Sequence, residues 1–254
     1  MLPPVLAFSA ALAFGLCIGS FLNVVIARLP EGKSLVFPPS TCPRCGHRIA
    51  WFDNIPVLSW LLLRARCRSC RGPISWRYPA GEAITAALFV AALLRFGISA
   101  DLVVALIFLC GLVAITGIDL ERQIIPDVIT LPGIATGFVL NLATGRVSWL
   151  DALLGILVGG GIFFVIILIS PAGMGGGDLK LGAMMGAFLG WQLGLLAILL
   201  GVLSGGVVAV CLLALGRKGR KDAVPFGPFL ALGGALSMLW GKSILAWYFA
   251  RFGL

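Results

Sequence analysis

The fold class is indicated by two apolar runs, LVVALIFLCGLVAITGI at residues 102–118 and VITLPGIATGFVLNL at residues 128–142. A short polar turn separates them. Each run is close to the roughly 20 residues that a helix needs to cross a bilayer. Charged residues are confined to the segment 119–127 between them. The stretch therefore predicts two membrane helices joined at one face of the bilayer.

The composition extends this interpretation to the whole chain. Of 254 residues, 60% are hydrophobic and only 11% are charged, and the mean hydropathy is +1.08. Soluble domains carry about 25% charged residues, so a soluble globular protein and a disordered chain are excluded. Further apolar runs lie at residues 3–27, 80–94, 150–169, 179–190, 193–215 and 225–247. We therefore expect an all-α polytopic membrane protein with about eight transmembrane helices.

The basic residues predict the orientation of these helices. If the runs cross the bilayer in alternation, 15 of the 19 Lys and Arg residues fall on one side, and the other side keeps only Arg95, Arg146, Lys242 and Arg251. Because basic residues collect in cytoplasmic loops, we expect the richer side to be cytoplasmic and both termini to lie outside. The net charge of +9 then follows from topology, and we expect no nucleic-acid partner. The first run lacks a basic start and a small-residue cleavage site, which predicts a retained span.

A polar stretch of some fifty residues between the first two runs contains two C-x-x-C pairs separated by 21 residues. Pairs at this spacing are typical of a zinc-ribbon-like site, in which four thiolates surround Zn²⁺. A closed four-cysteine site has no open position for water, so the metal would fold the loop rather than catalyse. Two disulfides are the alternative, but a cytoplasmic loop keeps thiols reduced. The predicted metal ligands are Cys42, Cys45, Cys67 and Cys70.

Two aspartates flank the polar turn with which this section began. Asp119 ends one apolar run, and Pro126 disfavours helix at the residue before it, so we expect a break there. Asp127 could then N-cap the next span. An ionisable residue at membrane depth is costly and is a functional candidate by default.

A third aspartate, Asp178, follows a glycine-rich loop and opens the run 179–190. Gly175 and Gly177 would let this loop bend sharply and approach other backbone closely. Lys180 lacks the flanking residues of a phosphate-binding loop, so a nucleotide site is disfavoured. The loop and Asp119 fall on the same predicted side. Two carboxyl groups brought together cannot both ionise cheaply, and aspartic proteases use this arrangement to activate water.

These motifs resemble the prepilin peptidases, also called type IV leader peptidases, which are membrane aspartyl proteases with a G-x-G-D motif. The likeness covers nearly the whole chain, and its motifs stand in the family's order. Besides the cysteine pairs, they are GSFLNVVIARLP at 19–30, DNIPVLSW at 53–60, ISWRYP at 74–79 with Glu82 in register, the D-x-x-x-x-x-I/L-P-D segment at 119–127, and GGGD at 175–178.

The resemblance implies catalysis by Asp119 and Asp178, with Asp127 as a possible additional carboxylate. It implies a first transmembrane helix at residues 1–27, a cytoplasmic zinc-binding loop domain at 28–78 and a transmembrane peptidase domain at 79–254. The implied substrates are precursors of type IV pilins or type II secretion pseudopilins. They would be cleaved after a leader Gly at the cytoplasmic face of a bacterial inner membrane, without metal or nucleotide in that step.

The cysteine loop makes the chain resemble those family members that also N-methylate the new amino terminus with S-adenosylmethionine. The residues offer no motif that points to a methyl-donor site. Polar side chains near the loop are the candidates, with loop folding and charge pairing as the competing explanation. These candidates are Asn23, Arg28, Glu31, Asp53, Asn54 and Glu82.

Two other functions compete with proteolysis. A proton- or cation-coupled transporter could use the three aspartates, and it predicts carboxylates near the bilayer midplane and internal repeats. A non-enzymatic assembly factor would explain the cysteines but not the glycine–aspartate loop. We expect Gly182, Gly186 and Gly190, which stand at four-residue spacing, to let helices approach closely beside that loop.

Overall fold

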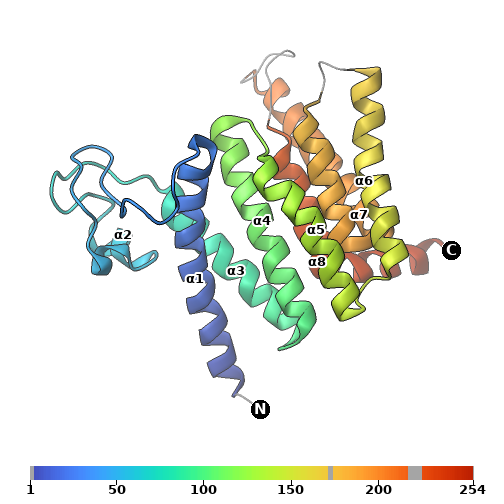
Figure 1. The fold of residues 1–254 in the computed structure, drawn as a ribbon, viewed down its shortest axis with the longest axis horizontal. Helices are drawn as coiled ribbons and strands as arrows, with labels where there is room; N and C mark the ends of the chain where they lie inside the picture. Colours follow the sequence, from blue (N-terminus) through green and yellow to red (C-terminus); the bar gives the residue numbers. More distant parts are fainter. Residues whose placement is uncertain (1–2, 171–173, 217–224, 254) are drawn as a thin grey trace. The chain divides into compact units, whose positions relative to one another are not determined.

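A computed structural model describes residues 3–170, 174–216 and 225–253 of the chain. In these residues the structure consists of helices and two isolated β-bridges. The chain forms two compact units, Met1–Ile98 and Ser99–Leu254, whose helices are labelled in Figure 1.

Unit 1 consists of two long helices and the cysteine module, which we define as residues 29–76. Both long helices have the length and hydropathy of membrane spans. The elements are α1 (Pro4–Arg28), η1 (Leu29–Glu31), η2 (Trp51–Asn54), α2 (Leu58–Leu62) and α3 (Arg77–Phe96).

Close backbone contact joins α1 to α3. A Cβ atom added to Gly15 would lie 2.6 Å from the Cα atom of Ala86, and one added to Gly19 would lie 2.6 Å from the Cα atom of Glu82. Larger residues would therefore push the two helices apart. Small residues at four-residue spacing serve this purpose in membrane helices, where burial of apolar surface from water cannot drive association.

Unit 2 is a bundle of five apolar helices in which α7 packs against α5, α6 and α8. Its elements are α4 (Ala100–Arg122), α5 (Asp127–Thr144), α6 (Trp149–Ile169), α7 (Gly176–Ala214) and α8 (Gly227–Phe252). The helix break expected before residue 126 is confirmed, because α4 ends and α5 begins on either side of it.

Helix α7 is two membrane helices joined at Gly190. That glycine has φ 77° and ψ 174°, which no α-helix contains. A Cβ atom added to Gly194 would lie 3.4 Å from the Cα atom of Gly186, whereas eight residues of straight helix span about 12 Å. The chain therefore folds back on itself here. We call residues 176–189 the first arm and residues 191–214 the second arm.

The side chain of Asn141 on α5 supports this reversal. Its Nδ2 donates to the carbonyl oxygens of Ala187 and Phe188, at 2.7 and 3.2 Å. The last carbonyls of a helix have no partner within that helix, and the first arm ends at this point. The buried amide therefore satisfies polar groups that the break at Gly190 leaves open.

The reversal decides how many times the chain crosses the membrane. In the described residues, seven helices are long and apolar enough to span a bilayer, and the two arms of α7 raise this number to eight. An even number of crossings between α4 and α8 is required, because the first residue of α8, Gly227, hydrogen-bonds Asp119 near the end of α4. The expectation of about eight transmembrane helices is confirmed.

Candidate active site and metal centre

Asp119 lies in the last turn of α4 and is only 5% exposed. Its Oδ2 accepts a hydrogen bond of 2.9 Å from the backbone N–H of Gly227. A Cβ atom at Gly227 would come within 2.7 Å of the same oxygen, so a side chain there would displace the carboxyl group. The positive end of α8 also faces this carboxyl group, which favours negative charge on it.

Asp178 is the third residue of α7 and is half-buried. Its backbone N–H bonds the carbonyl of Gly175, which precedes the helix in an extended conformation. Gly177 packs on Ile125 so closely that a Cβ atom would lie 2.8 Å from the Ile125 Cβ. Ile125 belongs to the connection that follows α4. This contact brings the glycine loop to the end of α4, and an electrostatic interaction links the carboxyl groups of Asp178 and Asp119.

Asp127 has a different environment. It is the first residue of α5, and both of its carboxylate oxygens lie 2.6 Å from the Nζ atom of Lys180. The prediction that Asp127 caps α5 was wrong: Pro126 occupies the cap position, and no side chain caps the helix. Helix α5 starts one residue earlier than expected, because proline is already in the extended conformation that a cap requires.

The described residues provide no cationic side chain for Asp119 or Asp178, in contrast to Asp127. Two adjacent carboxyl groups without a cation favour the state in which they share one proton. Such a pair can take a proton from water and give one to a leaving group. Both aspartates lie in terminal helical turns rather than near a bilayer midplane, which disfavours the transporter alternative.

Sequence reasoning did not find Gly227 or the partner of Asp127. Gly227 and the following Pro228 begin α8, a pattern typical of helix starts, but nothing local connects it to a residue 108 positions earlier. Lys180 stands two residues after Asp178. Its pairing with Asp127 depends on the packing of α5 against α7, which a single sequence does not reveal.

The four cysteines of the module converge on one point. One sulfur atom of each lies within 4.8 Å of every other, and the sulfurs of Cys42 and Cys70 are 3.9 Å apart. All the cysteines in the chain are free, so the disulfide alternative is not what this structure contains. Four thiol groups at these separations match the donor set of a tetrahedral metal site. The predicted ligand cluster of Cys42, Cys45, Cys67 and Cys70 is confirmed as a group that could hold a metal.

The two knuckles have the same backbone geometry. The N–H of Cys42 bonds the carbonyl of His47 at 2.9 Å, and the N–H of Cys67 bonds the carbonyl of Gly72 at 2.8 Å. The bridges Thr41↔Arg48 and Arg66↔Pro73 close both loops in the same way. The equivalence indicates that each C-x-x-C pair presents its two sulfurs through one repeated turn.

The first knuckle also prepares a thiolate. The backbone N–H groups of Arg44 and then Cys45 are directed at the sulfur of Cys42, and they lower the pKa of its thiol to about 6. Metals bind the thiolate rather than the thiol. The turn therefore favours the thiolate at Cys42, whereas burial and the interactions with Cys42 and Cys70 raise the pKa of the Cys45 thiol to about 11.

Two of the polar candidates for methyl-donor binding lie at the junction of the module with the long helices. The buried Glu82 of α3 accepts a 2.7 Å hydrogen bond at Oε2 from the N–H of Val57. Asn23 of α1 donates from Nδ2 to the carbonyl of Tyr78 at 3.0 Å. The first contact holds the module to α3, and the second joins α1 to α3.

The remaining candidates are engaged inside the module or exposed on it. Arg28 donates to the carbonyl of Ser34, and Glu31 pairs with Lys33 at 2.6 Å. Asn54 is exposed at the end of η2.

Asp53 forms a two-pronged ion pair with Arg68, which spans the distance between η2 and the second knuckle. The hydrogen bonds from Arg68 lower the pKa of the Asp53 carboxyl. These contacts agree with the competing explanation of loop folding and charge pairing. The assignment of all six residues to a methyl-donor site stays a prediction.

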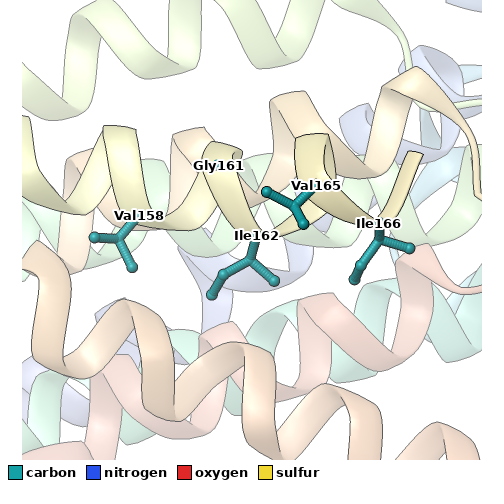
Figure 2. A pocket seen from close by; sticks show the side chains of 5 residues that line it. All are labelled: Val158, Gly161, Ile162, Val165 and Ile166. Atoms are coloured by element: carbon teal, nitrogen blue, oxygen red, sulfur yellow. The ribbon is translucent and has the colours of Figure 1, made fainter. Parts of the chain in front are cut away.

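A shallow depression of about 470 Å³ lies elsewhere, on α6. Figure 2 shows that its five lining residues come from this single helix. They are Val158, Gly161, Ile162, Val165 and Ile166. All are apolar, so the depression offers no group for acid–base chemistry and forms no part of the aspartate site.

Comparison with known proteins gives a consistent result for both units. The family model described as "Bacterial Peptidase A24 N-terminal domain" matches residues 13–96, and that of the "Type IV leader peptidase family" matches residues 106–210. No solved structure matches the chain.

Several curated relatives are similar over most of their length. The prepilin leader peptidase/N-methyltransferase of Aeromonas hydrophila is 41% identical over 98% of this chain and 96% of the relative. The protein of that name from Pseudomonas aeruginosa is 38% identical over 92% of this chain and 90% of the relative. The one from Myxococcus xanthus is 48% identical over 82% of this chain and 64% of the relative.

Fold and site together define a multi-pass helical membrane protein with a four-cysteine module and a pair of aspartates at helix ends. The chain belongs to the type IV leader peptidase family, peptidase A24. The family expected from the sequence motifs is thereby confirmed.

Proposed function

We propose that this protein is a bifunctional prepilin leader peptidase and N-methyltransferase. It removes the leader from precursors of type IV pilins or type II secretion pseudopilins after a Gly, and then methylates the new amino terminus. Family membership and the names of near full-length relatives support this function. The observation that carries it is the contact of Gly177 with Ile125, which brings Asp178 at the start of α7 to the end of α4, where Asp119 lies.

In this mechanism the two aspartates share one proton. The N–H of Gly227 and the start of α8 stabilise negative charge on Asp119, so Asp119 takes a proton from the attacking water. Protonated Asp178 donates a hydrogen bond to the scissile carbonyl, and its proton then passes to the leaving amine. Asp127 keeps its charge pair with Lys180 and helps to position the start of α7.

Zinc is the metal that fits the cysteine cluster. Four converging thiol groups in a loop with two matched knuckles are the donor set of a structural Zn²⁺ site. Cys42, Cys45, Cys67 and Cys70 would hold the ion. When bound, it supplies folding energy to the loop.

S-adenosylmethionine is the proposed methyl donor. Five of the six polar candidates already bind partners within the chain, so we derive no methyl-transfer step through them.

We place the active site at the cytoplasmic face of a bacterial inner membrane. The basic loops support this orientation, and Asp119, Gly227 and the glycine loop share one end of the helices. Cleavage of a precursor whose leader remains in the cytoplasm requires this arrangement.

The test is incubation of the purified protein in lipid with a prepilin precursor, followed by mass measurement of the product. Loss of the leader mass shows cleavage, and a further gain of one methyl group shows methylation. Asp119→Asn and Asp178→Asn should each lower the cleavage rate by about 10²–10⁴-fold, the range expected when an acid or base is removed.

Asp101→Asn is the matched control. It makes the same chemical change in the first turn of α4, at the opposite end of the helix that carries Asp119, and should leave cleavage unchanged. Full activity in either dyad variant would remove this mechanism. An unchanged precursor with the unsubstituted protein would remove the function.

A further inference from the structure

Helix α2 of the cysteine module exposes its leucine side chains and buries its serine. Its three leucines stand at positions i, i+3 and i+4 and so share one face. Leu58, Leu61 and Leu62 are 50%, 57% and 73% exposed. The one polar side chain, Ser59, is only 6% exposed and donates to the carbonyl of Phe52. A helix that turns leucines outward and serine inward is suited to an apolar surrounding.

The residues just before α2 extend this exposed apolar surface. Helix α2 packs against η2, and the side chains of Trp51, Phe52 and Ile55 are 82%, 47% and 40% exposed. We call residues 51–62 the interfacial segment. Large exposed apolar side chains gathered in one short segment are typical of a binding site, and Trp is enriched where a protein meets the membrane–water boundary.

Basic residues border the interfacial segment. Residues 28–77 include nine Lys and Arg residues and two acidic residues, and both acidic residues pair with basic ones in the module. The exposed Arg64 and Arg66 directly follow α2, and the guanidinium of Arg68 lies 5.4 Å from the ring centre of Phe52. An apolar surface with an excess of arginine is complementary to anionic lipid, which offers acyl chains beneath negative headgroups.

The segment is held at a fixed place against a membrane helix. Val57 has φ 58° and ψ −48°, and the N–H of Leu58 bonds the carbonyl of Pro56 across it. This tight turn is strained for a β-branched residue. The buried Glu82 of α3 holds it by accepting the Val57 N–H, so the start of α2 is tied to a transmembrane helix.

The module is also joined at both ends to helices that are long and apolar enough to span a membrane. Helix α1 has 25 residues and is therefore about 37 Å long, which exceeds the roughly 30 Å hydrocarbon core. Figure 1 shows the module beside the C-terminal half of α1 rather than beyond its end. A module tethered at the end of so long a helix is expected to lie within reach of the headgroup region.

We propose that the interfacial segment inserts into the surface of the membrane leaflet on the basic side, with Trp51 and the leucine face of α2 at the acyl boundary and Arg64 and Arg66 on anionic headgroups. This contact makes the lipid surface a structural partner of the metal module. It fixes the module against the membrane in which the apolar substrate lies.

The test uses the full chain with a benzophenone amino acid in place of Leu62. The protein is reconstituted in nanodiscs of equal parts phosphatidylcholine and phosphatidylglycerol, irradiated, and analysed by mass spectrometry. The same probe at Ser69, an exposed residue of the second knuckle, is the matched control. Zinc content is measured for both variants, so that only folded modules are compared.

We expect lipid adducts from position 62 in large excess over position 69. Adducts from position 62 to residues 99–254, or to a second copy of the chain, would overturn the proposal, and so would equal lipid labelling at both positions. Arg64→Gln with Arg66→Gln should lower the adduct yield several-fold with phosphatidylglycerol and leave it unchanged in pure phosphatidylcholine. Equal yields in both lipids would overturn the role of the arginines.

Discussion

Different kinds of interaction stabilise the cysteine module and unit 2. In the described residues of the module, only Ser59 and Gly72 are buried. The converging cysteine sulfurs, which could hold a metal, the matched turns and the Asp53–Arg68 ion pair therefore maintain its shape. A loop this small cannot build a core of its own. Unit 2, by contrast, has no ligand cluster among its described residues and depends on helices packed backbone to backbone.

Glycines make this close packing possible. A Cβ atom on Gly186 of α7 would overlap the carbonyl oxygen of Gly155 on α6, and one on Gly182 would lie 2.6 Å from the carbonyl oxygen of Gly159. The packing expected at this four-residue spacing is confirmed for these two positions. Gly190 has a different task, because its positive φ allows the reversal of α7. Because their stabilising interactions differ, we expect each of the two regions to unfold without the other.

Removal of the metal should have the largest effect, and only on the module. Structural zinc contributes on the order of 10 kcal/mol to the folding of small domains, so chelation or Cys67→Ser should unfold residues 29–76. Limited trypsin digestion measures this, because the peptide bonds that follow the exposed arginines of the module fit the protease only when the surrounding backbone is unfolded. Zinc content should fall in parallel, while thermal unfolding of the helices of unit 2 stays unchanged.

Cys211→Ser is the control for this experiment. Cys211 is an exposed cysteine in the second arm of α7, so its replacement should alter neither zinc content nor trypsin sensitivity. If the chelated protein kept its resistance to trypsin, the module would have a source of stability other than metal.

Gly186→Ala should have the opposite effect: unit 2 should be destabilised and the cysteine module should stay intact. The new methyl group meets the backbone of α6, which cannot rotate away, so unit 2 should lose about 3 kcal/mol or more. Zinc content should stay at the wild-type value. The measurement is the midpoint of thermal unfolding in lipid or detergent, followed together with zinc release.

Gly161→Ala is matched to that variant. Gly161 lies on α6, and a Cβ atom there has no neighbour within 4 Å. Alanine should therefore be neutral or stabilise the helix by up to about 1 kcal/mol. Equal loss of stability in both variants would show that helix propensity rather than close packing decides the outcome.

The parts of the structure that could be predicted are those that depend on residues close together in the sequence. Each C-x-x-C knuckle is complete within eight residues, so its role as a ligand pair follows from spacing alone. Asp119 and Asp178 could be singled out because one stands at a helix break and the other after a glycine loop. Apolar runs of nearly bilayer length gave the membrane helices for the same reason.

What could not be predicted depends on contacts between distant residues. Gly227 reaches Asp119 only because the reversal at Gly190 returns the chain to the same face of the membrane. The capping role expected for Asp127 was wrong because Pro126 takes the cap position, and the partner that Asp127 binds, Lys180, lies on another helix that a local pattern does not reveal. In both cases tertiary packing decided which partner the carboxyl group binds.

The junction between the module and α3 offers a smaller, sharper test of the contrast. Glu82→Ala leaves the N–H of Val57 without its acceptor, which costs about 1.5–3 kcal/mol for a hydrogen bond to a charged group. The metal cluster is untouched, so zinc content should stay constant. Amide hydrogen exchange at residues 57–62 should accelerate by roughly 10- to 100-fold, while exchange at the two knuckles stays slow.

Glu82→Gln separates hydrogen bonding from charge, because the amide keeps a carbonyl oxygen that can accept from Val57. Exchange in this variant should lie near the wild-type rate if the acceptor matters, and near the alanine rate if the charge does. Unchanged exchange in Glu82→Ala would mean that the strained turn at Val57 is held by the metal cluster alone. In that case α2 would belong to the module's own fold, and the hydrogen bond to Glu82 would not be what holds it to α3.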